Sequence, residues 1–189
     1  MYHLWRRSKS RRKIMVNERV IWSDVISFIK ATPNLPAEYD VIQAAQAQII
    51  DIQSPILVLD MIGAPRYSWQ GTKDIPLQNG NMEHQELFYQ EYVFQLTALK
   101  KRSMEDVGLS SMDVLNLVAI HLQSEYGVNM MTQAGYGIER IKEIRTGYFL
   151  NSNDVYERQP SFDFVLNRKQ VLSSEIPALS GMSGLCYQV

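Results

Sequence analysis

Hydrophobic and polar residues alternate most clearly from Leu87 to Lys101. One set of alternate positions is apolar, and the other carries polar side chains: Phe88, Tyr92, Phe94, Leu96 and Ala98 against Glu91, Gln95 and Thr97. A period of two places the two sets on opposite faces of a β-strand. The wealth of Tyr, Phe, Val and Thr disfavours a helix. The pattern predicts a long, central, antiparallel strand with one buried face.

Three further segments are predicted as strands. Pro55 to Gly63 is rich in branched apolar residues and is closed by a Gly-Ala-Pro sequence. Glu157 to Val171 places Phe162, Phe164 and Leu166 in alternation with Asp163, Val165 and Asn167. Ile138 to Leu150 is also predicted as a strand, with an irregularity at Gly147. These segments are the candidate partners of the central strand.

Two segments between these strands are less regular. Val41 to Ile52 suits a helix or a strand, and the extended form is favoured because Pro55 and the next strand follow closely. Arg66 to Glu83 contains Gly71, Pro76 and Gly80 and has little periodicity, so it predicts a long hairpin loop or flap. Loops of this length inside a compact domain are usually mobile or functional.

Two helices are predicted from apolar residues at three- and four-residue spacing. The first spans Asn17 to Ala31, with Asn17 as its N-cap, Asp24 and Lys30 on its outer face, and a core stripe made of Val20, Ile21, Val25, Phe28 and Ile29. The second opens at Ser110 or Ser111 and ends at Gly127. Its stripe comprises Met112, Leu115, Val118, Ala119, Leu122 and Tyr126.

This order of elements predicts an α+β fold, an antiparallel β-sheet covered on one face by two α-helices. At 189 residues and 46% hydrophobic content, one domain with a proper core is expected. The expected organisation is a basic arm over residues 1–16, a single domain over 17–172 and a C-terminal tail over 173–189. From Ser173 onward the Ser, Gly and Pro content indicates a segment without committed structure.

The small net charge of −1 hides an asymmetry between the arm and the rest. Six basic residues precede the first acid: Arg6, Arg7, Lys9, Arg11, Arg12 and Lys13. Without them 19 − 6 = 13 basic residues face 20 acidic ones, a formal charge of −7. This balance excludes an ordinary nucleic-acid-binding domain, and the arm suits phosphate or a neighbour's acidic surface. A flexible, solvated tail explains it equally well. No apolar segment suits a secretory signal or a membrane span.

No catalytic, cofactor-binding or metal-ligating residue is nominated. His121 has only Glu125 at a ligand spacing, and an isolated helical histidine is usually a packing or surface residue. His84 lies beside Glu83 and Glu86, where a solvated charged patch is the simpler interpretation. The single cysteine, Cys186, excludes an internal disulfide, and no phosphate-binding loop or nucleophile elbow occurs. The chain is therefore not expected to be an enzyme or to carry a cofactor.

The order of the elements, together with three local motifs, resembles a known family. Val41-Ile42-Gln43-Ala44-Ala45-Gln46 precedes a Ser54-Pro55 strand entry, Gln90 to Leu99 reads QEYVFQLTAL, and Tyr156 to Leu166 reads YERQPSFDFVL. In this order they are similar to the tail-terminator proteins of tailed bacteriophages, particularly the neck-terminator group of long-tailed phages. The resemblance covers roughly residues 20–170. The central strand lacks the family's frequent Asp-Phe/Tyr-Gly ending.

The resemblance implies a structural virion protein of the phage tail or neck, assembled in the host cytoplasm. It would form a ring, normally a homohexamer, that caps the head-proximal end of the tail tube and stops its polymerisation. The implied partners are the tail tube protein, a neck, connector or head-completion protein, and the tail sheath protein. DNA would only pass through the channel, and no membrane is involved.

Two alternatives remain open from the residues alone. One is another ring of the neck, such as a head-closure or head–tail adaptor protein. The other is a small cytosolic α+β ligand-binding domain or hydrolase, which would need a concave pocket with convergent polar groups. The residues expected to contact neighbouring subunits or rings lie in the flap and the arm: Arg66, Tyr67, Trp69, Lys73 and Asp74, and Arg6, Arg7, Arg11 and Arg12. An exposed, solvated loop is the competing interpretation of the flap.

Overall fold

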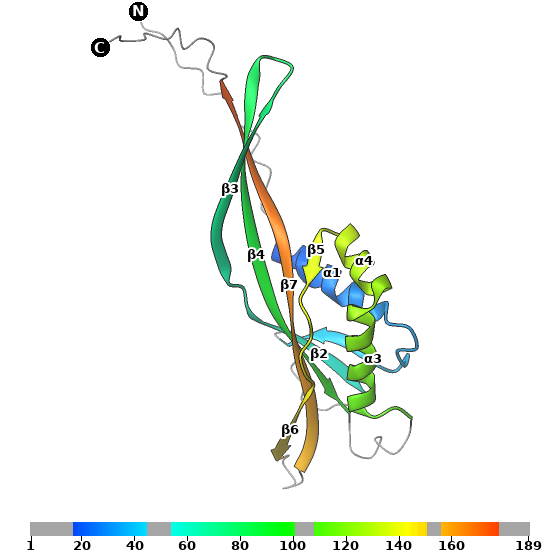
Figure 1. The fold of residues 1–189 in the computed structure, drawn as a ribbon. Coiled ribbons are helices and arrows are strands. Elements are labelled where there is room, and N and C mark those ends of the chain that lie inside the picture. Colours follow the sequence, from blue (N-terminus) through cyan, green and yellow to red (C-terminus); the bar gives the residue numbers. More distant parts are fainter. Residues whose placement is uncertain (1–16, 45–53, 101–107, 151–155, 178–189) are drawn as a thin grey trace, which may run out of the picture. The chain divides into compact units, whose positions relative to one another are not determined.

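The computed structural model describes residues 17–44, 54–100, 108–150 and 156–177, and of residues 66–70, 149–150 and 156–158 it describes only the backbone. Chain contacts divide the protein into two compact units. We call the larger unit, residues 16–67 and 89–169, the body. The described part of the smaller unit, residues 68–88 and 170–177, is called the ribbon (Figure 1).

Within the described residues the elements are seven strands and three helices. The helices are α1 (Glu18–Lys30), α3 (Ser111–Gln123) and α4 (Glu125–Gln133). The strands are β1 (Asp40–Gln43), β2 (Ile56–Gly63), β3 (Arg66–Pro76), β4 (Asn81–Leu99), β5 (Tyr136–Ile138), β6 (Arg145–Leu150) and β7 (Tyr156–Pro177). The sheet order is β1-β2-β4-β7-β5, with β3 beside β4 and β6 beside β7. The predicted α+β class is confirmed.

The central strand predicted from alternation is β4, which begins earlier than expected, at Asn81. Tyr92, Phe94, Leu96 and Ala98 are buried, at 4% exposure or less. They pack with alternate residues of β2 and β7, and the rings of Phe94 and Phe164 stack with centroids 5.4 Å apart. In the body the three helices lie on this same side of the sheet, as Figure 1 shows. One apolar face per strand therefore builds the core.

Helix α1 confirms the first predicted helix and its cap. The side chain of Asn17 accepts a hydrogen bond from the backbone N–H of Arg19, which satisfies one of the free donors of the first turn. Two side chains differ from the prediction. Val20, placed in the core stripe, is 45% exposed. Asp24, placed on the outer face, instead accepts a hydrogen bond from the hydroxyl of Tyr136.

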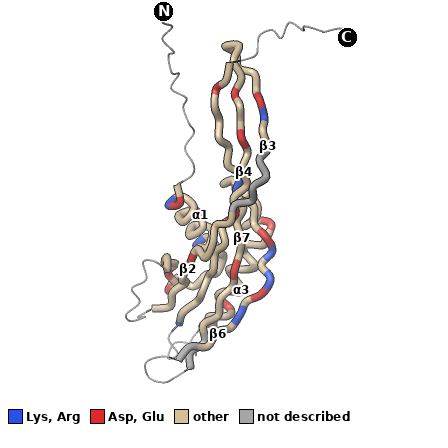
Figure 2. The backbone as a smooth tube through the Cα atoms, turned by 90° about the vertical axis from the view of Figure 1, so that its left-hand side faces the viewer, with Lys and Arg blue, Asp and Glu red and all other residues tan. Residues whose placement is uncertain are grey.

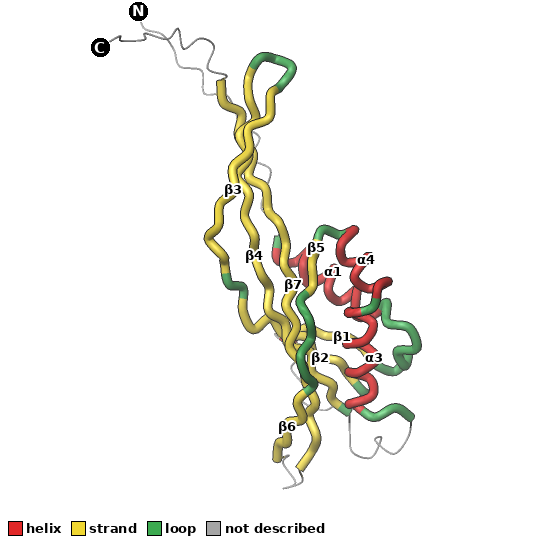
Figure 3. Tube along the Cα trace, viewed as in Figure 1, coloured by secondary structure: helices red, strands yellow, loops and turns green. Residues whose placement is uncertain are grey.

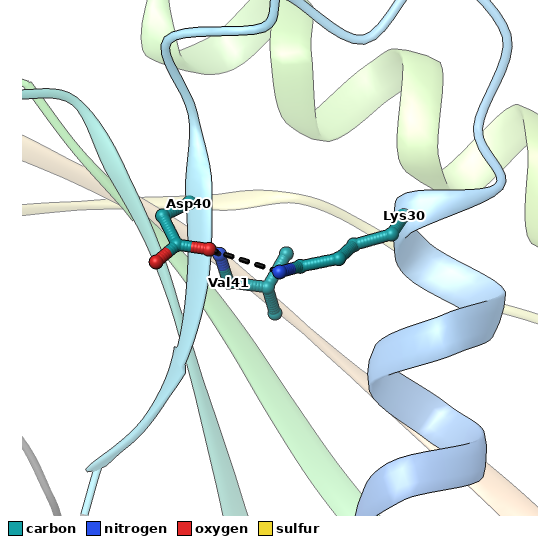
Figure 4. Close-up of polar contacts among 3 residues, drawn as sticks. All are labelled: Lys30, Asp40 and Val41. Atoms are coloured by element: carbon teal, nitrogen blue, oxygen red, sulfur yellow. Dashed lines mark hydrogen bonds and ion pairs between the residues drawn. The ribbon is translucent and has the colours of Figure 1, made fainter.

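A polar contact joins the end of α1 to β1 (Figure 4). One carboxylate oxygen of Asp40 lies 3.0 Å from Lys30 Nζ and accepts the Val41 backbone N–H at 2.8 Å. These bonds, the Lys30 bond foremost, hold the pKa of Asp40 below its usual value. Both side chains are largely exposed, so the contact fixes direction more than it adds stability. Of the extended segment predicted over 41–52, strand β1 covers residues 41–43; Ala44 follows the strand, and residues 45–52 lie outside the described part.

The second predicted helix is two helices. Helix α3 begins as expected, with a capping box between Ser110 and Asp113, but it ends at Gln123 instead of at Gly127. Ser124 is in an extended conformation, caps α3 and serves as the N-cap of α4. Tyr126, placed in the core stripe, is 67% exposed on α4. Gly127 lies inside α4, because its missing side chain lets that helix approach the carbonyl oxygen of His121.

Strands predicted on either side of 150 are only partly confirmed. The 138–150 segment is interrupted at residues 139–144, not at Gly147, and its two ends, β5 and β6, both pair antiparallel with β7. Strand β7 confirms the 157–171 prediction and continues to Pro177, beyond the position where the C-terminal tail was expected to begin. The predicted turn at 151–154 lies outside the described residues.

The prediction of a long loop or flap over residues 66–83 is wrong. Residues 66–76 form β3, which pairs with β4, and only residues 77–80 form the turn. The turn closes through the Leu77 N–H to Asn81 carbonyl bond of 2.8 Å, with Gly80 at a φ of +82°. Gly71 lies within the strand beside Leu87 on β4, where an added Cβ would make ordinary van der Waals contact with that side chain. Figure 3 shows the ribbon as strand and turn.

Candidate assembly surfaces

The body exposes the sheet face opposite the helices. We call this surface the open face, and it carries the alternate residues that point away from the core: Val58, Asp60, Ile62, Val93, Gln95, Asp163 and Val165. No described helix covers it. The register pairs Asp60 with Gln95 and Val58 with Thr97 across β2 and β4. The open face is therefore ordered by the same pairings that order the core.

A polar row crosses the middle of the open face. The amide nitrogen of Gln95 donates to one carboxylate oxygen of Asp163 at 2.9 Å, and Arg145 Nη2 binds the other oxygen. Asp60 stands opposite Gln95 on the far side of β4. Since Gln95, Asp163 and Arg145 come from β4, β7 and β6, the row fixes three strands at one level. The same groups can hydrogen-bond a partner that approaches this face.

Apolar side chains flank the polar row. Ile62 is 50% exposed, and Val58, Val93 and Val165 are half-buried. Apolar side chains gathered on a sheet face that no described helix covers are more typical of a contact surface than of a fully solvated sheet face. The open face is the first candidate assembly surface.

The ribbon is the second candidate. It consists of the end of β3, the start of β4 and the end of β7, and within the described residues no helix lies over either of its faces (Figure 3). Asp74 and His84 lie opposite each other, with Oδ1 and Nδ1 2.6 Å apart, and Glu86 lies 3.9 Å from the other ring nitrogen. The side-chain amides of Asn79 and Asn81 both donate to Glu175.

The ribbon is acidic. Its described residues include Asp74, Glu83, Glu86 and Glu175 but one basic residue, Lys73, which gives 1 − 4 = −3 with His84 neutral. Figure 2 shows the acidic residues on all three strands. Hydrogen bonds from the side-chain amides of Asn81 and Asn79 hold the pKa of Glu175 below its usual value. The ribbon therefore offers hydrogen-bonded strands and negative charge to a partner.

A third polar cluster supports the body from inside. Tyr136 is 1% exposed; its hydroxyl donates to Asp24 at 2.7 Å and accepts from Arg168 Nη1 at 2.6 Å. The guanidinium carbon of Arg168 lies 4.6 Å from the ring centroid. Burial, followed by the bond to Asp24, raises the pKa of Tyr136, which keeps the hydroxyl protonated. The cluster joins α1, β5 and β7 and positions the sheet that carries the open face.

The residues predicted as contacts are brought together only in part. Lys73 and Asp74 are exposed neighbours on β3, so they point to opposite faces of the ribbon. Arg66, Tyr67 and Trp69 lie on β3, and the description there is limited to their backbone. Arg6, Arg7, Arg11 and Arg12 lie outside the described residues. The contact role of all nine stays a prediction.

Several residues of these surfaces were missed. His84 was interpreted as part of a solvated patch, but it pairs with Asp74, ten residues away. Gln95 and Asp163 stood on the expected polar faces, yet their partnership depends on the register of β4 against β7. Asn-Gly followed by Asn at positions 79–81 was the available hairpin signal. It predicts a tight turn and hence the pairing of Asp74 with His84.

The described residues contain no group of three His, Cys, Asp or Glu placed to hold a metal ion. His121 is a packing residue, 4% exposed at the end of α3. None of the described helices is long and apolar enough to cross a membrane. Whether the chain has catalytic activity stays a matter of prediction.

An uncovered sheet face and an uncovered acidic ribbon are typical of a subunit that buries its surfaces in an assembly. Comparison with family models agrees with this class. The chain belongs to the family of the E217 gateway protein gp29, whose model matches residues 18–178, that is 161 of 189 residues. This makes it a phage structural protein of the neck region, and so a virion protein. Comparison with curated proteins gives no significant match.

Proposed function

We propose that the protein forms a ring, a homohexamer, at the head-proximal end of the tail tube. The ring ends polymerisation of the tube and joins the tail to the neck. Membership of the gateway family supports a place in the neck, and the resemblance to tail terminators supports contact with the tube. The observation that carries the proposal is the ribbon, three strands over which no described helix lies on either face.

A ring of identical subunits needs two different surfaces that fit one another, since each subunit contacts the next in the same way. The open face and the ribbon are two such surfaces, and they differ in chemistry: one has apolar flanks, and the other is acidic and rich in strand edge. Lys73 and Asp74 contribute to contacts between subunits, as do Arg66, Tyr67 and Trp69 on the same strand. The basic arm, with Arg6, Arg7, Arg11 and Arg12, contacts an acidic neighbour.

The partners follow from the position. The tail tube protein contacts one side of the ring, and a connector or head-completion protein contacts the other; the tail sheath protein is a further neighbour where the tail contracts. Outside the arm the formal charge is −7, which suits a channel that passes DNA without binding it. DNA is therefore a passenger and not a ligand.

Tube polymerisation tests the terminator role. Purified tail tube protein is polymerised with increasing amounts of the ring, and tube lengths are measured by electron microscopy. A terminator shortens the tubes in proportion to its concentration and is found at one tube end. Tubes of unchanged length without bound ring would contradict termination.

A second candidate is another ring of the neck, such as a head-closure or head–tail adaptor protein. The family match favours it to the extent that it describes a gateway protein and not a terminator. The polymerisation experiment distinguishes a terminator from an adaptor, because an adaptor binds the connector and leaves the tube length unchanged. Pull-down with tube protein and with connector protein, measured side by side, decides between them.

Charge reversal at both Lys73 and Asp74 tests the ribbon contact. The double variant Lys73→Glu with Asp74→Lys keeps the net charge but exchanges the charges of the two ribbon faces. We expect the population of closed rings to fall, while the thermal midpoint of the chain shifts by a few degrees at most, because both side chains are exposed. Unchanged ring closure would remove these two residues from the subunit contact.

A further inference from the structure

The outer edge of β3 has no strand beside it within the described residues, where β4 is its one strand neighbour. An edge strand presents a row of backbone N–H and C=O groups that can pair with an added strand. Pro76 ends this edge, since proline lacks the N–H that pairing needs. With 11 residues at about 3.3 Å each, β3 offers about 36 Å for such pairing.

The two faces beside this edge differ in charge. The turn bond between Leu77 and Asn81 and the pairing of Asp74 with His84 belong to the same register, because 77 + 81 and 74 + 84 both equal 158. Asp74 therefore shares its face with His84 and Glu86, while Lys73 points to the other face. A strand added here meets a carboxylate on one face and an ammonium on the other.

The N-terminal arm has a charge pattern that fits this edge. Arg7, Lys9, Arg11 and Lys13 recur at every second position, with serines at two of the positions between them. In an extended strand these four side chains lie on one face, whereas in a helix they would be divided between two sides. Residues 6–13 span about 26 Å when extended, which is shorter than β3.

We propose that residues 6–13 of a second copy of this chain add as a strand to the outer edge of β3. Arg7, Lys9, Arg11 and Lys13 lie on the face of Asp74 and Glu86, away from Lys73. Opposite charges on adjacent strands of one face stabilise the pairing, and like charges would oppose the other orientation. The inference rests on the proposed ring, in which each arm would link its subunit to the next.

Zero-length carbodiimide cross-linking tests the contact, because it joins a lysine amine to a carboxylate only where the two touch. Equal amounts of full-length chain labelled with ¹⁴N and ¹⁵N are mixed before assembly, cross-linked and digested for mass spectrometry. We expect Lys9 or Lys13 joined to Asp74 or Glu86, in peptides that combine the two isotopes. Links found only within a single isotope would assign the arm to its own chain, and links to Asp60 or Asp163 would assign it to the open face; either result overturns the proposal.

Two arm variants of identical composition provide the control. Arg7→Glu with Arg11→Glu changes the face toward Asp74, and Arg6→Glu with Arg12→Glu changes the other face by the same charge. The first variant lowers the yield of mixed-isotope links by about tenfold, the scale of two partly screened ion pairs, and the second lowers it by a smaller factor, because Arg6 and Arg12 lie on the face away from Asp74. Equal losses in both variants would contradict the strand geometry.

Light scattering on the same samples separates this inference from the proposed function. Rings without the expected links overturn the strand addition and leave the ring intact. A monomer without links between copies overturns both. Asp74→Lys combined with Arg7→Glu and Arg11→Glu is expected to recover ring formation that each change alone weakens, which a general loss of folding would not allow.

Discussion

Gly127 shows how one absent side chain sets the arrangement of two helices. A Cβ at this position would lie 2.1 Å from the carbonyl oxygen of His121 and 3.3 Å from the Cα of Leu122. Both atoms belong to the backbone of α3, so they cannot rotate away. The close approach of α3 and α4 therefore requires glycine here, in a conformation that other residues also adopt.

Replacement of Gly127 by alanine is expected to lower the free energy of unfolding by about 1–3 kcal/mol, because the two helices must separate. Thermal unfolding followed by circular dichroism measures it. Gly147→Ala is the matched control, since the nearest atom to its Cβ is 3.5 Å away. A loss at position 147 equal to that at 127 would show that the helix contact is not the cause.

His121 makes stability depend on pH. Its pKa is lowered from the usual 6.5, chiefly by burial, while a hydrogen bond with the backbone of Phe28 acts in the opposite direction. Nε2 has no hydrogen-bond partner among the described residues. The folded state therefore holds a neutral ring, whereas the unfolded chain takes up a proton as the pH falls below 6.5.

The free energy of unfolding is expected to fall as the pH decreases below 6.5, by at most about 1.4 kcal/mol per pH unit from this group. Below the folded-state pKa the folded and unfolded states both bind the proton, and the stability contributed by the neutral ring is lost. Urea titrations at several pH values measure the slope. His121→Gln should flatten it and leave assembly intact; a slope that survives the substitution would assign the pH dependence to other groups.

The environment of single residues could be predicted where the spacing of apolar residues and the chemistry of near neighbours determine it. The buried set of β4 and the caps at Asn17 and Ser110 could be predicted because each depends on neighbours within four residues. The position of Asp24 could not, since its partner Tyr136 is 112 residues away. Pairings such as Gln95 with Asp163 require the strand order, which the pattern of one strand does not contain.

At the scale of elements, Tyr136 joins three segments that are distant in the chain. It stands on β5, bonds to Asp24 on α1 and receives the guanidinium of Arg168 on β7. Removing the hydroxyl would leave a partly buried carboxylate without its donor. A buried group that loses its partner costs more than the bond itself contributed.

Tyr136→Phe is therefore expected to lower the free energy of unfolding by about 1–3 kcal/mol. Chemical denaturation provides the measurement, and a double-mutant cycle with Asp24→Asn isolates the pair. Tyr148→Phe is the control, because that side chain is 63% exposed on β6. Additive losses in the cycle would mean that the two side chains do not interact.

Elements were predictable in proportion to their regularity. Strand β2 and helix α1 have continuous patterns and were predicted with nearly correct bounds, whereas β4 begins six residues before its predicted start and β7 continues six residues beyond its predicted end. Strand β3 was missed because Gly71 and the Lys73-Asp74 pair interrupt its apolar pattern, and its partner strand stabilises it instead. The division of the second helix at Ser124 was hidden by an apolar stripe that continues into α4.

At the scale of the whole molecule, the family and the exposed surfaces point in the same direction. The chain belongs to a phage gateway family, and its sheet has one covered and one open face in the body. Exposure of such apolar surface to solvent is unfavourable, and assembly into a ring would bury it. The class of protein, a phage structural protein of the neck region, could be expected from the sequence, because the order of its elements and its motifs carry it. The contacts between subunits could not be predicted, because they depend on a second copy of the chain.

The mass of the purified chain in solution, measured by light scattering with and without tail tube protein, tests the ring most directly. We expect six chain masses, about 131 kDa from a 21.8 kDa chain, either for the protein alone or once it meets the tube. A chain that stays monomeric at every concentration and ignores the tube would contradict the ring and the function built on it.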